Sequence, residues 1–582
     1  MKKILLLAFN LIIIQFSFAQ LAFNSAFSLG NNANDQGVAI AADASGNYYC
    51  TGFATYWMNA NPLGTPYYTT NNGGEDIYVA KYNSSGIMQW AFDIGSTGDD
   101  APLKIALDAG SNVYVAGRFT ATVDFDPGAG TATRTSNGGT DIFLVKFDSN
   151  GNFQWVNTFG GVNNEQAWDV TTDATSTNVI ITGGYLSPSM NMDPSGGTQI
   201  ITNNGHPGFG VENCFVAAYS EFSGSYQWAF NIGGFNGATG HRVVTDNAGN
   251  IYVGGVCSND TLDFDPGPNL FWSYPVTGDE IFLAKYNSLR IPQWVNRYGG
   301  VYGETANSLA VDNNGGVYQG GYFNSDSMDV DPGAGTYYLH NYPNGVQDIY
   351  VVKFNSSSGS LNWAFAVGGS YSETAQDLVL DNAGHFYITG NYGSTVDFDP
   401  GPNVHQLTGQ LGSDAYLAKY DTAGNFMNVI PFNGNGGTQF GIGLCIIPPN
   451  KIGVTGFFSA DTIDFDPGPG VYNLFVNGSN PTWTDAFVAT YTTGAVGLEE
   501  NNFPDQFIIY PNPADKGFNV QCSKCHVGGQ LKIFDAMGKE IYKTTITTLN
   551  IELETLNYPN GIYFIQLSTH DKIYNKKIII SH

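Results

Sequence analysis

The five residues Asp-Phe-Asp-Pro-Gly at positions 124–128 decide the fold, because this segment recurs along the chain at a nearly constant interval. Close copies occupy positions 263–267, 329–333, 397–401 and 464–468, and degenerate copies occupy 59–62 and 191–194. The seven copies start 65 to 72 residues apart. A period of this length predicts a repeated supersecondary unit whose neighbours bury a shared core.

Two further motifs flank each copy. The first is a hairpin signal, Asp-x-x-Gly-Asn at 43–47, since Gly and Asn favour tight turns. The second is a strand, Asp76–Tyr82, followed by Gln89-Trp90. It returns from Asp141, Asn213, Glu280, Asp348, Asp414 and Asp485. Seven repeats with about four strand-like runs each predict an all-β protein with a seven-bladed β-propeller.

The two ends of the repeat region predict how the ring closes. The seventh copy stops at Tyr491 without the strand that carries Trp in other copies, whereas residues 25–30 match 90–95 near the start of the chain. We infer that the N-terminal strand, residues 22–30, completes the last blade and covers its open edge. A solenoid would not need this arrangement, so a closed ring is favoured.

Composition agrees with many short strands joined by tight turns. The chain has 73 Gly, 14% aromatic residues and only 12% charged residues. Its net charge of −28 argues against nucleic acid as a partner, and favours divalent cations or basic surfaces. Cys522 and Cys525 are the only closely spaced cysteines, which predicts a local disulfide or no bond rather than a metal or redox site.

The first nineteen residues predict a secretory signal peptide. Lys2 and Lys3 precede an apolar run, and Ser17-Phe18-Ala19 supplies small residues for cleavage before Gln20. A membrane anchor fits less well, because the run has about 15 residues where a span needs about 20. We expect no transmembrane span in the mature chain. The predicted domains are a signal peptide (1–19), the propeller (20–492), a linker (493–506) and a C-terminal domain (507–582).

The C-terminal domain loses every repeat motif and becomes richer in Lys. Alternating strands with turn-forming Asn-Pro and Asn-Gly pairs predict a small immunoglobulin-like β-sandwich. An adhesive or carbohydrate-binding sandwich is the alternative for this segment.

Both regions resemble known families. The repeats resemble the seven-bladed β-propeller repeat (SBBP) family through Asp43–Gly52 and Asp76–Tyr82, which implies an exported propeller but no common activity. Residues 507–582 resemble the type A sorting domain of the type IX (Por) secretion system, which implies this machinery as a partner and a secreted or outer cell-surface location. The matching motif residues are Tyr510, Pro511, Asn512, Pro513, Gly538, Lys539, Gly561 and Tyr563, before a terminal Lys-Lys-Ile-Ile-Ile.

The Asp-Phe-Asp-Pro-Gly loops allow two interpretations. Alternate residues of an extended segment share a side, so both carboxylates of a loop could bind Ca²⁺. Pro-Gly also forms a turn unaided, which favours a structural role. The candidate calcium ligands are Asp124, Asp126, Asp263, Asp265, Asp329, Asp331, Asp397, Asp399, Asp464 and Asp466.

Recurring lysines and tryptophans have structural interpretations. Five lysines of the strand motif that begins at Asp76 in the first repeat occur in repeats that also carry the hairpin aspartate, which predicts ion pairs within these blades. The pairs are Asp43–Lys81, Asp108–Lys146, Asp246–Lys285, Asp312–Lys353 and Asp381–Lys419. The recurring tryptophans predict packing between blades, with ligand stacking as the alternative.

Ligand sites are expected where the repeats differ. His206 and Phe209 lie in the longest insertion, and Tyr56 and Trp57 lie in the atypical first loop, so these four residues are candidates for a binding rim. The sequence has no GxSxG, HExxH or Walker motif. We expect an extracellular protein that binds a glycan or protein ligand. The alternatives are a carbohydrate-active hydrolase or lyase using two carboxylates near the propeller tunnel, and a structural surface scaffold.

Overall fold

A computed structural model confirms the all-β prediction, since its described residues form strands and no α-helix. One compact unit spans Gln20–Thr493, and a second holds the C-terminal strands. The structure describes residues 21–493 except 175–176, 206–209, 268, 275–277, 279, 344–345, 411, 460–461, 469 and 478–482, and residues 507–581 except 511–513, 523–529, 535–539, 546–549, 556–557 and 569–572. The predicted signal peptide and residues 494–506 of the predicted linker lie outside this range.

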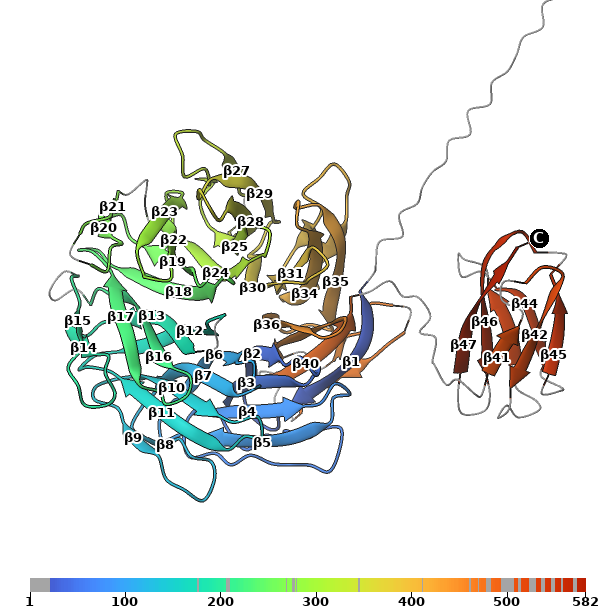
Figure 1. Ribbon diagram of the computed structural model, residues 1–582, viewed down its shortest axis with the longest axis horizontal. Helices are drawn as coiled ribbons and strands as arrows, with labels where there is room; N and C mark the ends of the chain where they lie inside the picture. Colours follow the sequence, from blue (N-terminus) through green and yellow to red (C-terminus); the bar gives the residue numbers. More distant parts are fainter. Residues whose placement is uncertain are drawn as a thin grey trace, which may run out of the picture. The chain divides into compact units, whose positions relative to one another are not determined.

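Within the described residues of the larger unit, seven sheets of four main antiparallel strands are arranged in a ring (Figure 1), and residues of the innermost strands line a channel. We number them by sequence and give their strands from the channel outward. Sheet 1 contains β2 (Asp35–Ala42), β3 (Tyr48–Ala54), β4 (Asp76–Tyr82) and β5 (Met88–Ile94). Sheet 2 contains β6 (Ala101–Leu107), β7 (Val113–Phe119), β10 (Asp141–Phe147) and β11 (Phe153–Phe159). Sheet 3 contains β12 (Glu165–Thr172), β13 (Asn178–Tyr185), β16 (Asn213–Ser220) and β17 (Tyr226–Ile232).

The other four sheets repeat this order. Sheet 4 contains β18 (Ala238–Thr245), β19 (Ile251–Cys257), β22 (Glu280–Tyr286) and β23 (Pro292–Gly299). Sheet 5 contains β24 (Glu304–Val311), β25 (Gly316–Phe323), β28 (Asp348–Asn355) and β29 (Leu361–Val367). Sheet 6 contains β30 (Thr374–Leu380), β31 (His385–Tyr392), β34 (Asp414–Asp421) and β35 (Phe426–Gly434). Sheet 7 contains β36 (Gln439–Ile447), β37 (Lys451–Phe458), β40 (Asp485–Thr492) and β1 (Ala22–Leu29).

The innermost strands contact one another in a closed circle, from β2 through β6, β12, β18, β24, β30 and β36 back to β2. Sheet 7 is built from both ends of the propeller, because β1 pairs antiparallel with β40 from Ala22↔Thr492 to Leu29↔Ala486. Phe27 of β1 is buried and lies 4.9 Å from the Tyr82 ring of sheet 1. The unit is therefore a closed β-propeller.

Burial explains why the two middle strands of each sheet read as almost continuous apolar runs. All seven residues of β10 are buried, because neighbouring sheets cover both of its faces. The outermost strands are only partly buried, since β11 and β17 each have one exposed residue and several half-buried ones, as expected for strands with one solvated face.

A short outer hairpin follows the second strand of most sheets. The hairpins are β8–β9 (Thr122–Asp124, Thr133–Thr135), β14–β15 (Ser189–Asn191, Ile200–Thr202), β20–β21 (Leu262–Asp263, Trp272–Ser273), β26–β27 (Ser327–Asp329, Tyr338–His340), β32–β33 (Thr395–Asp397, Gln406–Thr408) and β38–β39 (Ile463–Asp464, Asn473–Leu474). In sheet 1 a single bridge, Asn59↔Tyr68, takes this place. The Asp-Phe-Asp-Pro-Gly segment begins in the first strand of each hairpin that carries it.

Buried carboxyl groups mark the junctions between sheets. Asp485 begins the third strand of sheet 7, and Asp35 begins the first strand of sheet 1. Both are fully buried, and burial raises the pKa of Asp35 to about 8, with a further increase from the charge of Asp485. Burial likewise raises the pKa of Asp485 and Glu373 to about 7 and of Asp348 to about 6.

These carboxyl groups predict a protein that is more stable in mild acid than at neutral pH. Their folded pKa values exceed the unfolded value of about 4, so folding favours the protonated form. The resulting stability is complete below about pH 4 and is lost as pH rises through the folded values of about 6 to 8. The free energy of unfolding should fall by about 1.4 kcal/mol per pH unit for each such group that stays protonated. Urea unfolding from pH 4.5 to pH 8.5 would measure this decline.

Asp485→Asn is the matched variant for this decline, because Asn213 occupies the equivalent position in sheet 3. With this variant the free energy of unfolding should fall less steeply as pH rises, while the protein stays folded. His241 opposes the trend in part, since burial lowers its pKa to about 4 and it must become charged when the chain unfolds in acid. Stability that rises steadily from pH 5 to pH 8 would contradict the prediction.

The C-terminal unit contains two antiparallel sheets over one apolar core that includes Phe518, Val520, Ile565 and Ile578. One sheet has β41 (Phe507–Tyr510), β42 (Gly517–Cys522) and β45 (Asn550–Glu554). The other has β44 (Glu540–Thr545), β43 (Gln530–Phe534), β46 (Gly561–Ser568) and β47 (Ile573–Ile580). This arrangement agrees with the predicted sandwich.

Three residues of the predicted sorting motif are described in this unit. Tyr510 is exposed at the end of β41, Gly561 begins β46, and the buried Tyr563 donates a hydrogen bond to the Pro559 carbonyl oxygen at 2.8 Å. The other motif residues, Pro511, Asn512, Pro513, Gly538 and Lys539, lie outside the described residues. Cys525 also lies outside them, so the predicted Cys522–Cys525 relationship stays a prediction.

Candidate functional site

The recurring lysines and tryptophans meet at the junctions between sheets. At four junctions a Lys ammonium and a Trp indole N–H from one sheet donate to the same main-chain carbonyl oxygen of the next sheet. The donor pairs and acceptors are Lys81 and Trp90 on Ser149 (2.9 and 3.2 Å), Lys146 and Trp155 on Glu221 (2.7 and 3.4 Å), Lys285 and Trp294 on Ser356 (2.8 and 3.0 Å), and Lys353 and Trp363 on Thr422 (2.9 and 3.3 Å). We call this arrangement the junction clasp. One carbonyl oxygen has two lone pairs and satisfies both donors.

Other junctions use variants of the clasp. Lys419 donates to the Thr493 carbonyl oxygen at 3.3 Å, and Lys451 of sheet 7 donates to that of Ser84 in sheet 1 at 3.2 Å. Sheet 3 has Ala218 where five other sheets have Lys, and there Arg290 of sheet 4 lies over the Trp228 ring, 5.5 Å from its centroid. The cation thus comes from the opposite side of this junction.

The predicted Asp–Lys ion pairs form within 4 Å in two sheets. The distances are 3.7 Å for Lys146–Asp108 and 3.6 Å for Lys353–Asp312. In all five sheets a tyrosine lies between the two charges: its hydroxyl donates to the aspartate at 2.9 to 3.2 Å, and the Lys ammonium lies 4.7 to 5.5 Å from its ring centroid. These tyrosines are Tyr49, Tyr114, Tyr252, Tyr318 and Tyr387.

The clasp predicts that Lys146→Met destabilises the fold. It removes a buried charged hydrogen bond and leaves the Glu221 carbonyl oxygen with only the longer bonds from Trp155 and Tyr114, so the free energy of unfolding should fall by about 2 kcal/mol. Lys451→Met is the matched control, because Lys451 makes a single exposed hydrogen bond, and it should cost less than about 1 kcal/mol. Urea unfolding would measure both. Equal losses would show that the clasp adds nothing beyond a surface contact.

The Asp-Phe-Asp-Pro-Gly loops are stabilised by their own carboxylates. In sheet 5, Asp329 Oδ1 accepts hydrogen bonds from the Asp331 N–H at 3.2 Å and the Tyr337 N–H at 2.9 Å, and Asp331 Oδ1 accepts from the Gly333 N–H at 2.9 Å. The same three bonds occur in the other four loops. The residue between the two aspartates is buried in the core.

Asparagine makes the same main-chain contacts in the two degenerate repeats. Asn59 Oδ1 accepts from the N–H groups of Asn61 and Tyr67, and Asn191 Oδ1 accepts from those of Asp193 and Gln199. One uncharged oxygen is therefore enough at the first aspartate position. Among the described residues, no group of three or more His, Cys, Asp or Glu side chains could hold a metal ion.

This geometry predicts that Asp329→Asn is nearly neutral, within about 0.5 kcal/mol. Asp329→Ala leaves two N–H groups without their acceptor and should cost about 1 to 3 kcal/mol. Thermal unfolding of both variants, with and without millimolar Ca²⁺, would test the structural and calcium interpretations together. If Ca²⁺ raised the melting temperature of the parent protein but not that of Asp329→Asn, the loop would be a cation site.

Of the four predicted rim residues, two are described and lie side by side. Tyr56 and Trp57 have ring centroids 5.8 Å apart, and Tyr68 meets Trp57 edge to face at 4.7 Å. Tyr56 and Tyr68 are about half exposed. His206 and Phe209 lie outside the described residues. The first loop therefore presents a cluster of three aromatic rings, in which Tyr56 and Tyr68 are exposed and Trp57 is half-buried.

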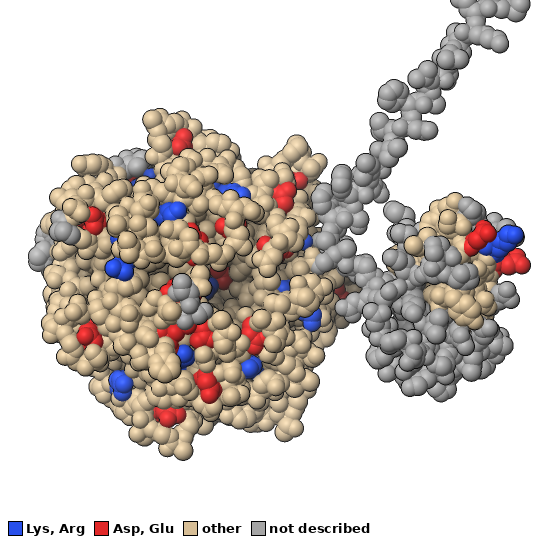
Figure 2. All heavy atoms as spheres, in the orientation of Figure 1, with Lys and Arg blue, Asp and Glu red and all other residues tan. Residues whose placement is uncertain are grey.

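Exposed aromatic side chains also occur on the segments between the second and third strands of other sheets. They concentrate in two arcs of the ring, sheets 7 and 1 and sheets 4 and 5. Beyond the cluster above, these residues are Tyr67, Trp272, Tyr274, Tyr337, Tyr338, Tyr342, Tyr472 and Phe475. On the face shown in Figure 2 the surface is mostly uncharged, with acidic and basic side chains scattered over it. Such exposed aromatic groups are typical of interaction surfaces.

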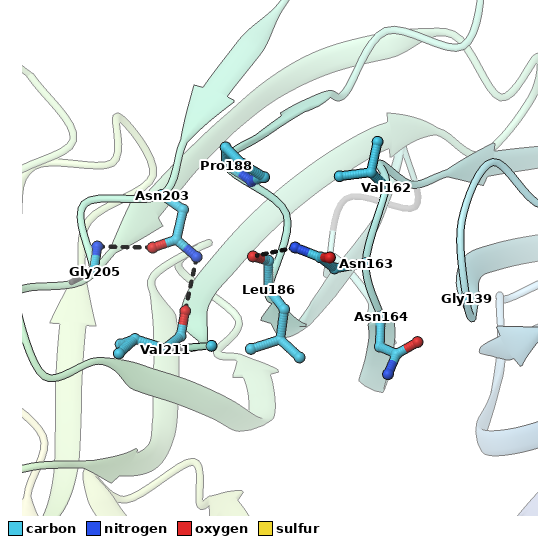
Figure 3. A pocket seen from close by; sticks show the side chains of 10 residues that line it. Gly139, Val162, Asn163, Asn164, Leu186, Pro188, Asn203, Gly205 and Val211 are labelled. Atoms are coloured by element: carbon cyan, nitrogen blue, oxygen red, sulfur yellow. Dashed lines mark hydrogen bonds between the residues drawn. The ribbon is translucent and has the colours of Figure 1, made fainter. Parts of the chain in front are cut away.

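A pocket of about 680 Å³ lies beside the longest insertion, among loops of sheets 2 and 3 (Figure 3). Its polar groups are largely engaged with one another. Asn203 donates to the Val211 carbonyl oxygen at 2.9 Å and accepts from the Gly205 N–H at 2.7 Å, while Asn163 donates to the Leu186 carbonyl oxygen at 3.1 Å. None of the described lining residues is charged, so the pocket offers little chemistry of its own.

The channel holds a set of charged residues that repeat analysis did not single out. Lys104, Asp169, Arg242 and Asp377 occupy equivalent positions in four innermost strands. Lys104 pairs with Asp377 at 3.0 Å across the ring, linking sheets 2 and 6. Burial raises the pKa of Asp169, and the charges of Arg242 and Lys104 oppose this rise. A comparison of the repeats was the signal that could have found them, because the residue type at this position varies from sheet to sheet while the residue after it stays apolar.

The C-terminal unit matches a known family. Residues 508–581 match the model described as the secretion system C-terminal sorting domain. Such a domain directs export, so the protein is delivered to the cell surface or secreted. In the part of the chain that the structure describes, no helix has the length and apolar character needed to cross a membrane.

Two curated relatives match the chain at low identity. An uncharacterized WD repeat-containing protein of Acanthamoeba polyphaga mimivirus is 23% identical and covers 86% of this chain. The regulatory protein FlaEY of Caulobacter vibrioides is 22% identical and covers 67%. The matched region spans about 40% of the length of either relative.

Solved structures give distant likenesses. PorZ, a surface component of the type IX secretion system of Porphyromonas gingivalis, is 12% identical, with 95% of this chain and 75% of that chain covered and a TM-score of 0.28. A europium-containing methanol dehydrogenase is 10% identical, with 81% and 93% covered and a TM-score of 0.34. Neither likeness bears on a ligand or a reaction of this protein.

Proposed function

We propose that this protein is an extracellular binding protein whose propeller rim recognises neutral glycans. The observation that carries the proposal is the aromatic cluster of Tyr56, Trp57 and Tyr68, continued by exposed aromatic side chains along the same arc. Aromatic faces stack on the apolar faces of sugar rings without needing charge. A chain with a net charge of −28 would repel acidic polymers at long range, which favours a neutral ligand.

Several expectations from sequence belong to this proposal. The repeats resemble the SBBP family, residues 1–19 form the signal peptide, residues 20–492 the propeller and residues 507–582 the sorting domain. In this scheme the type IX machinery reads the sorting domain, and the propeller then acts at the cell surface or after release. The repeated loops and junction lysines serve the scaffold, and recognition lies in residues that differ among the repeats.

An enzymatic role has less support from the channel carboxylates. Asp377 accepts hydrogen bonds from the Leu378 and Leu444 N–H groups and from Lys104. Asp169 accepts from the N–H groups of Val170 and Val243. Both carboxylates are thus held by the scaffold, which leaves them poorly placed to transfer protons to a glycan.

The rim proposal is tested by glycan binding with the full-length protein. Replacing both Trp57 and Tyr68 with Ala should weaken binding of a neutral polysaccharide at least about tenfold, since each stacking contact contributes on the order of 1 kcal/mol. Phe222→Ala is the matched control, because Phe222 is 92% exposed on a turn away from the rim, and it should leave affinity unchanged. A glycan array followed by affinity electrophoresis would measure both. If the polysaccharide retarded the protein equally with and without the Trp57 and Tyr68 replacements, the proposal would be overturned.

A further inference from the structure

Every innermost strand carries a bulge at the same position. In sheet 1, Gly37 pairs with Gly52 and Ala39 pairs with Thr51, so Val38 is an extra residue without a partner across the strand pair. The same one-residue shift occurs in the other six sheets. The seven bulge residues are Val38, Leu103, Trp168, His241, Asn307, Gln376 and Ile442. Bulges of this kind re-aim side chains and are common beside functional sites.

All seven bulge residues line one cavity of about 490 Å³ in the channel, which we call the bulge chamber. Its wall is divided into two halves. Ile442, Val38 and Leu103 come from the consecutive sheets 7, 1 and 2 and form an apolar half. The polar half comes from sheets 3 to 6 and presents an indole, an imidazole and two side-chain amides. A scaffold of near-identical repeats thus presents seven unlike side chains to one small volume, which is typical of a ligand site.

The charges around the bulge chamber are arranged unequally. Lys104 and Arg242 line it, whereas Asp169 and Asp377 line only the adjoining part of the channel. His241 is neutral at physiological pH, since burial lowers its pKa to about 4, and its Nδ1 lies 3.1 Å from the Ala306 carbonyl oxygen. The titratable groups that line the chamber are therefore cationic or neutral, and no described carboxylate faces it.

Two donors of the chamber residues have no partner among the described residues. The indole Nε1 of Trp168 and the guanidinium Nε of Arg242 are both buried without an acceptor. An unpaired buried donor destabilises the fold, and more so when it is charged. Among the described residues, Arg242 is otherwise bonded only to main-chain oxygens, of His241 at 2.9 Å and of Gln376 at 3.5 Å. The nearby Asp169 carboxylate accepts from the Val170 and Val243 N–H groups instead and leaves the Arg242 Nε–H unpaired. A further carboxylate is the acceptor that would match this guanidinium.

We propose that the bulge chamber binds a small carboxylate-bearing ligand, with the carboxylate against Arg242 and Lys104 and the body of the ligand against Val38, Leu103 and Ile442. The site is separate from the aromatic rim. Two sources share this chemistry: a free organic acid, and the terminal uronic acid of a glycan chain. Trp168 forms the wall beside the carboxylate, and Asn307 and Gln376 contribute amide groups to hydroxyls of the ligand.

The test is isothermal titration calorimetry of the full-length protein with matched pairs of compounds. Benzoate and glucuronic acid serve as carboxylates, and benzyl alcohol and glucose as their neutral counterparts. We expect at least one carboxylate to bind at least tenfold more tightly than its neutral partner, and its affinity to fall as salt rises. An oligosaccharide ending in glucuronic acid separates the two sources: tighter binding than the monosaccharide identifies a glycan end, and binding of benzoate alone identifies a free acid.

Variants locate the site. Arg242→Met should weaken carboxylate binding at least tenfold, and Arg134→Met, on the outer hairpin β8–β9, should leave it unchanged. Trp168→Phe keeps the shape of the wall and should lower affinity severalfold, so it serves if Arg242→Met fails to fold. Joint replacement of Trp57 and Tyr68 should have no effect, which separates this site from the rim. The proposal is overturned if neutral compounds bind as tightly as carboxylates, if no carboxylate binds at millimolar concentration, or if neither chamber variant alters affinity.

Discussion

The hydrogen bond from a lysine ammonium of one sheet to a main-chain carbonyl oxygen of the next is the polar contact that most junctions of the ring share. A single four-stranded sheet cannot cover both of its apolar faces, so each must be held against two neighbours. Lys146 is an example, since its ammonium donates to the Glu221 carbonyl oxygen of the next sheet. Within sheet 2 the same ammonium lies over the Tyr114 ring and pairs with Asp108. The tryptophan beside it fills the gap between the sheets and uses the same oxygen. Polar and apolar contacts thus fix one spacing around the circle.

Repetition made most of this fold predictable. The period of the Asp-Phe-Asp-Pro-Gly segment indicates the sheets and their order, and the mismatch between the chain ends indicates how the last sheet is completed. The group to which the lysines donate their hydrogen bonds was not predictable in the same way. Their acceptor is a main-chain oxygen, which every residue possesses, so no residue type in the sequence marks it. The nearby aspartate was the only visible candidate, and it is largely engaged by the tyrosine hydroxyl and the hairpin N–H groups.

The channel was missed for a related reason. Repeat comparison draws attention to positions that stay the same, whereas Trp168, His241 and Gln376 occupy a position that changes in every sheet. The bulge that carries them is a property of strand pairing, and no residue type marks it in the sequence. The Asp-Phe-Asp-Pro-Gly loops show the opposite case, because they are conspicuous in the sequence and yet form a structural turn that recurs in the repeats. In this molecule constancy marks the scaffold and variation marks the surfaces available for recognition.

The pairing of β1 with β40 also governs when the protein can fold. Ala22 and Thr492 are partners although 470 residues separate them, so the last sheet cannot form until nearly the whole propeller is present. Contacts between such distant residues form slowly, because the entropy of closing the loop must be overcome first. Closing of the ring is therefore a late step of folding, and the edge of β40 stays without its neighbour until β1 pairs with it.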